Sequence, residues 1–455
     1  MLWKSRPSSV AVSYPRRVFA RIGGSRFSVP IFLGLLTALL AWIRLPAIAR
    51  DTLWAEDGRN FLQDALNLGP IESLVVPYAG YLHTFPRIVA ALTVQFMPVQ
   101  LFALSMTFGA CLLAGIMGAI VYVCSADVVA WIPARVLIAT LTVLAPLAPR
   151  EVLGNMANLH SLALWTLLWV LLYRPRSRAG SIAIAVFVLL GTLTEIESVF
   201  LLPLLLWRPR DRSRWLVRST YLAGVAIQLC VTVIWPRGPS GNPPVDFWSI
   251  PYGYLINAVT PLWIPQDSIG VVVAWGGPAL CIALALPFAV AAFVVLRRGS
   301  SIQRVAATAL IVGSVIVYSV SVIENPNGFY DYADMSAAQL GSLWLARYGV
   351  VPSMMLCSLV LLAVGVIVAR RRSAVRLPAT RHSSRGAIVT PVVVGLVVLL
   401  LVQFFPQSTR RSSGPEWQPQ VAALSSRCES LPDGRSVHLR ETIDWSVTVP
   451  CGLLE

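Results

Sequence analysis

Long apolar stretches alternate with short polar ones along most of the chain, and most of these stretches approach the ~20 residues that an α-helix needs to cross a bilayer. We therefore predict about eleven membrane-spanning helices in an all-α, polytopic membrane protein. They cover residues 29–49, 99–124, 129–148, 158–173, 180–193, 195–207, 216–235, 271–296, 305–323, 349–369 and 387–405. Thr194, Glu195 and Glu197 interrupt the apolar residues between 180 and 207, which predicts a turn joining two short or tilted helices.

Two polar regions stand outside this pattern. Residues 50–87 form a large loop after the first span, and apolar residues from Phe61 to Leu68 recur there at helical spacing, which predicts helices lying in the membrane interface. The last fifty or so residues carry turn formers and short apolar–polar alternations, which predict a small β-rich appendage. The expected organisation is a basic amino terminus over 1–28, a transmembrane domain over 29–405 and a tail over 406–455.

Composition agrees with a membrane protein. Hydrophobic residues make up 56% of the chain and charged residues only 13%, which is too little polar surface for a soluble protein of this length. The formal charge of +15 comes almost entirely from arginine, since Lys4 is the only lysine. The arginines fall in short clusters between apolar segments, so we expect membrane lipids, and no nucleic acid, as partners.

The arginine clusters also predict how the chain is oriented. With the basic amino terminus they fall on one side of the predicted spans, which the positive-inside rule makes cytoplasmic. The clusters lie within residues 174–178, 208–218, 297–304 and 370–385. The 50–87 loop and the carboxyl-terminal tail then lie on the extracytoplasmic face of a multi-pass protein of the cell membrane.

The cysteines divide into two groups. Five of the seven lie inside apolar spans, where a thiol behaves as a small buried hydrophobe. Cys428 and Cys451 both lie in the polar tail. In an extracytoplasmic tail this isolated pair predicts a disulfide.

Candidate chemical groups gather near the outer surface. Glu56 and Asp57 precede the amphipathic run of the 50–87 loop, and each is either a catalytic carboxylate or a helix cap. His83 in the same loop is a candidate for positioning a hydroxyl or neutralising a phosphate, with a plain interfacial role as the alternative. His160 lies where two spans meet the outer surface, at a depth where polar groups face cavities. Glu195 is either a functional intramembrane acid or a solvated residue of a turn.

Several motifs stand in a characteristic order. WAEDGRNF opens the loop with paired acids and an aromatic residue, YAGYLHTFPR leads towards the second span, and GTLTEIES follows further on. This order resembles the GT-C superfamily of polyprenyl-phosphate-sugar glycosyltransferases, with the acids reversed, Phe61 in place of a tyrosine and Glu195 where a lysine is frequent. The resemblance covers roughly residues 29 to 207.

The resemblance implies a mechanism. Asp57 is the leading candidate for a general base because its spacing to Phe61 matches the family's catalytic acid, whereas the order of the pair favours Glu56. The base would deprotonate an acceptor hydroxyl, which attacks the anomeric carbon of a sugar carried on a polyprenyl phosphate, with inversion. The acceptor would be a cell-envelope glycan, lipid or protein.

The donor phosphate requires cationic groups on the outer side, where arginines are few. Arg347, followed by Tyr348 at the start of a span, is the leading candidate because a guanidinium holds phosphate oxygens in a bidentate fork. Arg59, Arg87 and Arg150 are the alternates. Pairing with lipid headgroups is the competing role for each of them.

Motifs that the sequence lacks, and its remaining acidic residues, bear on the other possible functions. The sequence has no zinc-type spacing of Cys and His, no Walker loop and no dinucleotide glycine fingerprint, which disfavours nucleotide-driven pumping and direct use of a nucleotide-sugar donor. No cofactor is indicated other than a possible divalent metal. Glu324, Asp331 and Asp334 are candidates for a divalent metal or an acceptor site. A transporter or lipid flippase with Glu195 and Glu197 as coupling acids is the rival class, although no pair of matching halves is evident. A noncatalytic scaffold for envelope assembly is a third possibility.

Overall fold

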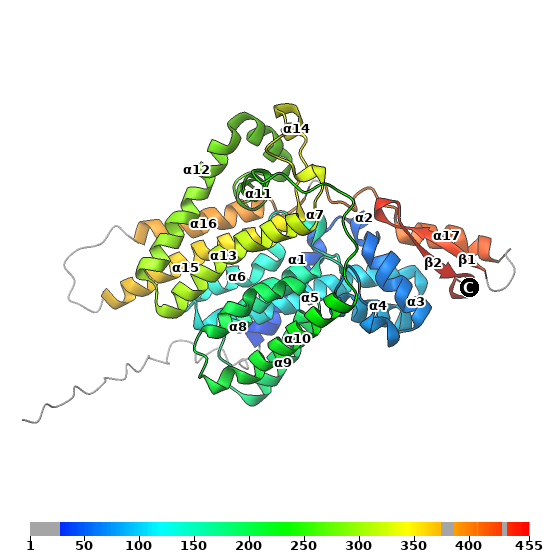
Figure 1. Ribbon diagram of the computed structural model, residues 1–455, viewed down its shortest axis with the longest axis horizontal. Coiled ribbons are helices and arrows are strands. Elements are labelled where there is room, and N and C mark those ends of the chain that lie inside the picture. Colours follow the sequence, from blue (N-terminus) through cyan, green and yellow to red (C-terminus); the bar gives the residue numbers. More distant parts are fainter. Residues whose placement is uncertain (1–27, 375–385, 407, 430–434, 455) are drawn as a thin grey trace, which may run out of the picture.

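The structure is mostly helical, as the fold class predicted (Figure 1). The computed structural model describes residues 28–374, 386–406, 408–429 and 435–454. Nearly all of the basic amino terminus and most of the basic linker before the last apolar helix lie outside the described residues. Every predicted apolar segment contains a helix.

Six helical segments among the described residues are long and apolar enough to cross a membrane, and the other apolar helices have 10–17 residues. The long segments are Val99–Asp127, Ile132–Glu151, Arg212–Ile234, Gln266–Arg298, Ser301–Glu324 and Arg347–Arg370. The shorter ones are Ser28–Arg44, Leu159–Leu172, Arg178–Thr192, Ile196–Leu206 and Thr390–Val402. Their labels in Figure 1 are α1 (Ser28–Arg44), α5 (Phe102–Cys124), α6 (Ile132–Leu144), α8 (Leu159–Leu172), α9 (Arg178–Thr192), α10 (Trp215–Ile234), α12 (Ile269–Arg298), α13 (Ser301–Glu324), α15 (Val350–Ala374) and α16 (Gly386–Val402).

The predicted break between residues 180 and 207 is confirmed. Helix α9 ends at Thr192, and a 3-10 helix runs from Ile196 to Leu206. The Glu195 carboxylate accepts a hydrogen bond of 2.8 Å from the backbone N–H of Glu197, so it caps the first turn of the 3-10 helix. Pro203 lies inside that helix and has no amide hydrogen to donate.

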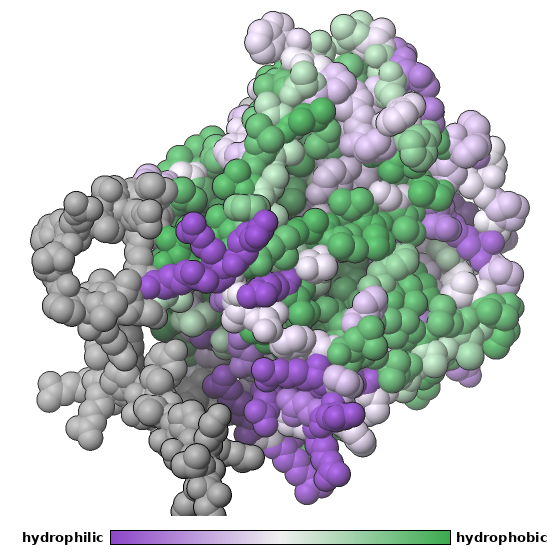
Figure 2. Space-filling model, turned by 60° about the vertical axis from the view of Figure 1, so that its left-hand side comes forward, coloured by the Kyte–Doolittle hydropathy of each residue, from purple (hydrophilic) through white to green (hydrophobic). Residues whose placement is uncertain are grey.

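Helix α8 lies at the centre of the bundle and α12 at its edge. Trp165 and Trp169 of α8 are fully buried, as expected for a helix that is apolar on all faces. Helix α12 exposes large apolar side chains, among them Trp275 and Phe293. Hydrophobic residues cover much of the surface in Figure 2, which suits contact with lipid.

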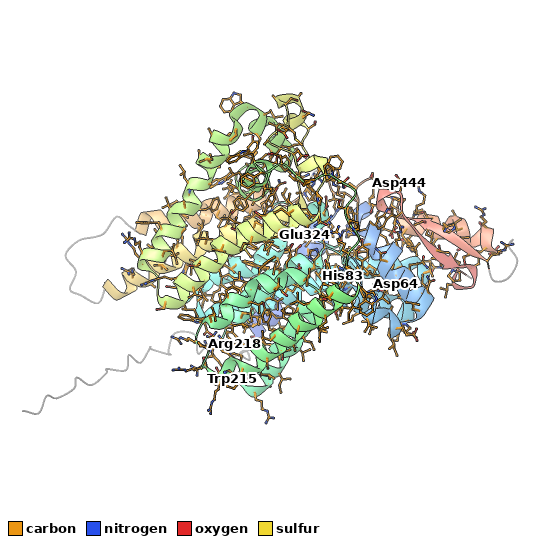
Figure 3. The ribbon with its side chains drawn as sticks, viewed as in Figure 1. Asp64, His83, Trp215, Arg218, Glu324 and Asp444 are labelled. Atoms are coloured by element: carbon orange, nitrogen blue, oxygen red, sulfur yellow. A yellow bond between two sulfur atoms is a disulfide. The ribbon has the colours of Figure 1, made fainter. Side chains whose placement is uncertain are left out.

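Helix ends that carry arginines gather at one end of the bundle. The Arg370 Nε at the end of α15 donates to the backbone oxygen of Arg298, at 3.1 Å. Arg176 pairs with Asp127 at 3.1 Å, which joins the residues before α9 to those after α5. Arg218 lies towards this end, whereas the 50–87 loop and the tail lie at the other (Figures 1 and 3). The arginine clusters and the polar loops are therefore separated along the bundle.

The 50–87 loop folds into a compact set of short helices. These are α2 (Ala47–Arg50), a π-helical turn (Asp57–Leu62), α3 (Gln63–Leu68) and a 3-10 turn (Glu72–Val75), followed by α4 (Thr84–Phe96). Arg87 of α4 is buried and pairs with Asp64 of α3 at 2.9 Å. Its guanidinium also donates to the Ser73 carbonyl and lies over the Phe61 ring. This buried cation therefore holds the loop together.

The tail forms a small appendage of one helix and one hairpin. Helix α17 (Trp417–Cys428) packs against strand β1 (Ser436–Arg440), which pairs antiparallel with β2 (Ser446–Pro450). The disulfide between Cys428 and Cys451 is present, with Cα atoms 5.4 Å apart. It ties the helix to the end of the hairpin, so the predicted pairing of the two tail cysteines is confirmed.

The appendage docks on the 50–87 loop. The backbone N–H of Trp417 donates to the Asp51 carbonyl at 2.6 Å, and its indole N–H donates to the Val99 carbonyl at 2.7 Å. Gln63 of α3 exchanges two hydrogen bonds with the backbone of Thr448 in β2. The tail thus packs against residues that precede it by more than three hundred positions.

Candidate functional site

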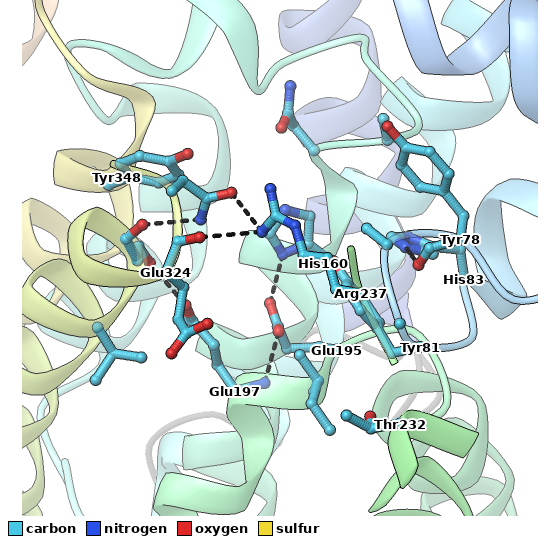
Figure 4. A pocket seen from close by; sticks show the side chains of 18 of the residues that line it. Tyr78, Tyr81, His83, His160, Glu195, Glu197, Thr232, Arg237, Glu324 and Tyr348 are labelled. Atoms are coloured by element: carbon cyan, nitrogen blue, oxygen red, sulfur yellow. Dashed lines mark hydrogen bonds and ion pairs between the residues drawn. The ribbon is translucent and has the colours of Figure 1, made fainter. Parts of the chain in front are cut away.

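A cavity of about 370 Å³ lies where the 50–87 loop meets the helix bundle (Figure 4). One wall comes from residues 78–83 of the loop, and another from the turn that leads into α8. Further lining comes from the start of the 3-10 helix at residues 195–200, from the end of α13 and from the residues just before α15. Glu56, and Thr232 with Arg237 at and after the end of α10, complete it, so the cavity collects side chains from seven separate parts of the chain.

A buried chain of polar groups forms one side of the cavity. Glu195 is 1% exposed, and its Oε2 lies 2.5 Å from Nδ1 of His160. Glu197 accepts a hydrogen bond of 2.7 Å from the Ser321 hydroxyl of α13. All four residues line the cavity, so the two glutamates that looked ambiguous in the sequence are both cavity residues.

His83 lies on the facing wall. Its Nε2 is 3.2 Å from the Tyr78 carbonyl oxygen, and its ring lies against Tyr81 with centroids 4.1 Å apart. Burial, followed by electrostatic effects of His160 and Arg87, holds the pKa of His83 well below its usual range. The ring is therefore neutral at physiological pH, which argues against the predicted option that it neutralises a phosphate.

Arg347 reaches the cavity from the turn before α15. Its Nη1 donates to Glu151 Oε2 at 3.2 Å, while the other oxygen of Glu151 accepts from Arg410 at 3.0 Å. The Arg347 Nε has no hydrogen-bond partner among the described residues. Tyr348 also lines the cavity, with its ring 5.2 Å from the Arg347 guanidinium carbon. One carboxylate is thus shared by two arginines, so Glu151 alone does not neutralise both of them.

Arg237 is a cavity residue that the sequence analysis missed. It donates to the backbone oxygen of Glu324 at 3.2 Å and to the side-chain oxygen of Asn325 at 2.8 Å. Burial, then the charge of Glu56, raises the pKa of Tyr78 to about 12, and the charges of Arg237 and Arg347 act in the opposite direction. The signal in the sequence was the scarcity of arginines in outer loops, which applies to Arg237 as much as to Arg347.

Glu56 and Asp57 have different environments although they are adjacent. Glu56 lines the cavity, and its Oε2 has no hydrogen-bond partner among the described residues. Asp57 is not part of the cavity wall. Its two oxygens accept hydrogen bonds from the backbone N–H groups of Met156 at 3.0 Å and Ala157 at 2.7 Å. Burial raises the pKa of Asp57 to about 7, against the opposing effects of these two bonds and of Arg411. Asp57 therefore fastens the loop to the turn before α8.

The other arginines singled out in the sequence do not line the cavity. The Arg59 guanidinium lies over the Trp445 ring of the appendage, 4.5 Å from its centroid. Arg87 is committed to its ion pair inside the loop. Arg150 lies over the Trp344 ring at 5.5 Å. Among the alternates to Arg347, none is placed to meet a ligand held in this cavity.

The appendage supports the backbone on both sides of Glu56. The Thr442 hydroxyl accepts a hydrogen bond of 3.3 Å from the N–H of Ala55, and the Glu441 carboxylate accepts one of 2.9 Å from the N–H of Arg59. A side chain at Gly58 would overlap the second oxygen of Glu441, so this close contact requires glycine. The residues before and after Glu56 are therefore fixed by the tail.

The contact at Glu441 is expected to depend on pH. Burial raises the pKa of this carboxyl from 4.5 to about 9, so between these values the folded protein retains a proton that the unfolded chain has lost. Its contribution to stability is then complete below pH 4.5 and falls as the pH rises towards 9. We expect the melting temperature to fall from pH 6 to pH 9, and to fall less in Glu441→Gln. An identical decline in both proteins would show that another group controls it.

The described residues contain no group of three or more His, Cys, Asp or Glu side chains arranged to hold a metal ion. Of the outer acids considered for such a site, Glu324 lines the cavity, whereas Asp331 and Asp334 do not.

Fold and site together define a helical membrane protein with a polar cavity at one end of its bundle. No protein-family model, curated protein or solved structure matches the chain. The similarity to the GT-C superfamily therefore rests on the sequence motifs.

Proposed function

We propose that this protein is a membrane glycosyltransferase of the GT-C type, which moves a sugar from a polyprenyl phosphate to a hydroxyl of a cell-envelope glycan, lipid or protein. The observation that carries the proposal is the pairing, in one cavity, of Glu56 with Arg347. Among the described residues, Glu56 Oε2 and Arg347 Nε have no hydrogen-bond partner, so the first can accept a proton and the second can donate to an anion. A base and a phosphate-binding group are the two parts that this reaction requires.

Arg347 suits the phosphate because its orientation is already fixed. Glu151 holds one end of the guanidinium through Nη1, so little conformational freedom is lost when phosphate oxygens bind the rest. Glu151 also forms an ion pair with Arg410, so its single negative charge cannot neutralise both arginines. Arg347 therefore remains the cationic group available to an anionic ligand at this position, whereas Glu56, Glu195, Glu197 and Glu324 bring carboxyl groups to the rest of the wall.

The apolar part of the cavity suits a prenyl chain. Val199 and Phe200 of the 3-10 helix line it, together with Val320 of α13. These residues belong to segments that we propose to be membrane-embedded, so the lipid tail of a donor could remain among apolar side chains while its phosphate meets Arg347. A water-soluble nucleotide-sugar has no prenyl chain to pack against these apolar side chains.

The reaction would proceed in one displacement. The Glu56 carboxylate takes the proton of the acceptor hydroxyl as its oxygen forms a bond to the anomeric carbon of the donor sugar. The bond from that carbon to the phosphate oxygen breaks, and the polyprenyl phosphate leaves with the electron pair. Arg347 stabilises the charge that develops on the phosphate. Glu56 then releases its proton, and configuration at the anomeric carbon is inverted.

The proposed sidedness follows from the separation of charges along the bundle. We infer that all of the predicted apolar helices cross the membrane and that the arginine-rich end is cytoplasmic. The cavity, the 50–87 loop and the appendage would then be extracytoplasmic, with the amino terminus inside. The disulfide of the appendage supports this side, because such bonds persist in oxidising compartments.

Replacing Arg347 by alanine is expected to weaken binding of a prenyl phosphate about 10- to 100-fold, since charge-assisted hydrogen bonds contribute about 1.5–3 kcal/mol. Isothermal titration of the purified protein with farnesyl phosphate measures this directly. Arg59→Ala is the matched control, because Arg59 lies outside the cavity and should leave the affinity unchanged. Equal affinities for wild type and Arg347→Ala would remove Arg347 from the donor site.

A transporter or lipid flippase is the second candidate, favoured by the buried pair of Glu195 and His160. Acids at such depth are typical of proton-coupled carriers. Proteoliposomes given a radiolabelled polyprenyl-phosphoryl sugar and an acceptor separate the two functions. Label that moves onto the acceptor supports the transferase, whereas label that changes leaflet but stays on its carrier supports the flippase.

A further inference from the structure

The hydrogen-bonding state of His83 follows from its neighbours. The Tyr78 carbonyl can only accept, so the hydrogen lies on Nε2 of the ring. Nδ1 then carries a lone pair, and it has no hydrogen-bond partner among the described residues. His83 is only 3% exposed and lines the cavity. A buried acceptor without a partner is costly unless a ligand supplies the missing donor.

His160 presents a second acceptor from a different part of the chain. The carboxylate of Glu195 accepts from Nδ1, so in the neutral ring the lone pair lies on Nε2. Glu195 is itself fixed by the backbone N–H of Glu197. A carboxylate that orients a histidine in this way fixes both its tautomer and the direction of the ring.

Both acceptors lie close to the proposed phosphate site. A second, smaller cavity is lined by His160, Glu195 and Glu197 together with Arg347 and Tyr348. A group bonded to a phosphate at Arg347 would therefore be next to His160. The wall of the larger cavity also includes Glu56, whose Oε2 has no hydrogen-bond partner among the described residues, and the carboxyl group of Glu324. These four groups are all acceptors, so a ligand that satisfies them must supply several hydrogens.

We propose that His83 and His160 accept hydrogen bonds from hydroxyl groups of the sugar carried on the phosphate, so that this wall selects the glycosylated donor over the bare lipid phosphate. The proposal rests on the function proposed above and identifies the residues of the cavity that recognise the sugar. A polyhydroxylated ring is the ligand class with enough donors for these acceptors. The Tyr81 ring beside His83 adds an apolar face against which such a ring can lie.

The expected effects follow from the strength of neutral hydrogen bonds. Each bond lost should reduce affinity for the sugar-bearing donor by up to about tenfold, and loss of both by up to about a hundredfold. Affinity for a prenyl phosphate without a sugar should not change, because neither histidine is assigned to the phosphate. This difference separates recognition of the sugar from a general effect on the cavity.

The experiment compares farnesyl phosphate with a panel of farnesyl-phosphoryl hexoses and pentoses, by isothermal titration of the full-length protein in nanodiscs. Wild type should bind at least one sugar-bearing probe more tightly than farnesyl phosphate. His83→Phe and His160→Gln should each reduce that preference, and the double variant should abolish it. His438→Phe, at an exposed position of the appendage, is the control and should retain it.

Two results would overturn the proposal. One is a wild-type protein that binds every probe with the same affinity. The other is a pair of histidine variants that weaken bare farnesyl phosphate as much as its sugar derivatives, since the rings would then only maintain the cavity. Sugar-selective binding without any transfer would instead contradict the transferase and leave this assignment intact.

Discussion

Glu56→Gln is expected to reduce sugar transfer by about 10²- to 10⁴-fold, the usual contribution of a general base. The amide has nearly the same shape as the carboxylate but cannot take a proton from the acceptor hydroxyl. Because the side chain is only partly buried and makes no hydrogen bond through Oε2, folding should be unaffected. Transfer of radiolabelled sugar in proteoliposomes, together with thermal unfolding, measures both quantities.

The control for this change is Glu72→Gln. Glu72 is an exposed acid of the same loop, away from the cavity wall, and its substitution should leave transfer unchanged. Donor affinity should also be similar in wild type and Glu56→Gln, because the phosphate is assigned to Arg347. Full activity in Glu56→Gln would show that another group acts as the base.

Asp57→Ala is expected to lower the free energy of unfolding by about 2–6 kcal/mol. The substitution leaves the N–H groups of Met156 and Ala157 buried without acceptors, and each such group costs about 1–3 kcal/mol. It also removes a negative charge near the buried Arg411. Thermal or denaturant unfolding in detergent, followed by circular dichroism, gives the size of the loss.

Asp57→Asn distinguishes this structural role from catalysis. The amide oxygen can still accept a hydrogen bond, so the variant should be more stable than Asp57→Ala and should retain transfer in proportion to its folded fraction. A stably folded Asp57→Asn protein without transfer activity would restore Asp57 as the base, the role that the sequence resemblance implied.

The helical segments could be predicted because their signal is local. Apolar runs located the helices of the bundle, six of whose segments are long enough to span a membrane among the described residues, and the polar residues around Glu195 marked the break between α9 and the following 3-10 helix. The Cys428–Cys451 disulfide was also predictable, since these are the two cysteines of the polar tail. The helices and the break depend on residues that are close together in the sequence, and the disulfide depends on which cysteines lie in the polar tail.

The choice between the paired acids could not be made from local spacing. Asp57 was favoured by its distance along the chain to Phe61, but the residues between them form a π-helical turn, and Phe61 is buried against Tyr78 and His83. Whether Glu56 or Asp57 faces the cavity is decided by Met156 and Ala157, about a hundred residues away. The place of Arg237 in the cavity lining is likewise set by distant contacts, with Glu324 and Asn325, although the scarcity of arginines in the predicted outer loops could have drawn attention to it.

The dependence of the 50–87 loop on the tail has a consequence for biogenesis. Residues 410–454 are synthesised after the helices of the bundle, so the bundle can insert into the membrane before Ala55 and Arg59 have the partners that fix the backbone around Glu56. Until Thr442 and Glu441 are in place, the part of the cavity wall that Glu56 forms is not fixed. If the proposed function is correct, newly inserted chains would therefore lack transferase activity, and this activity would begin only once the carboxyl-terminal appendage has folded.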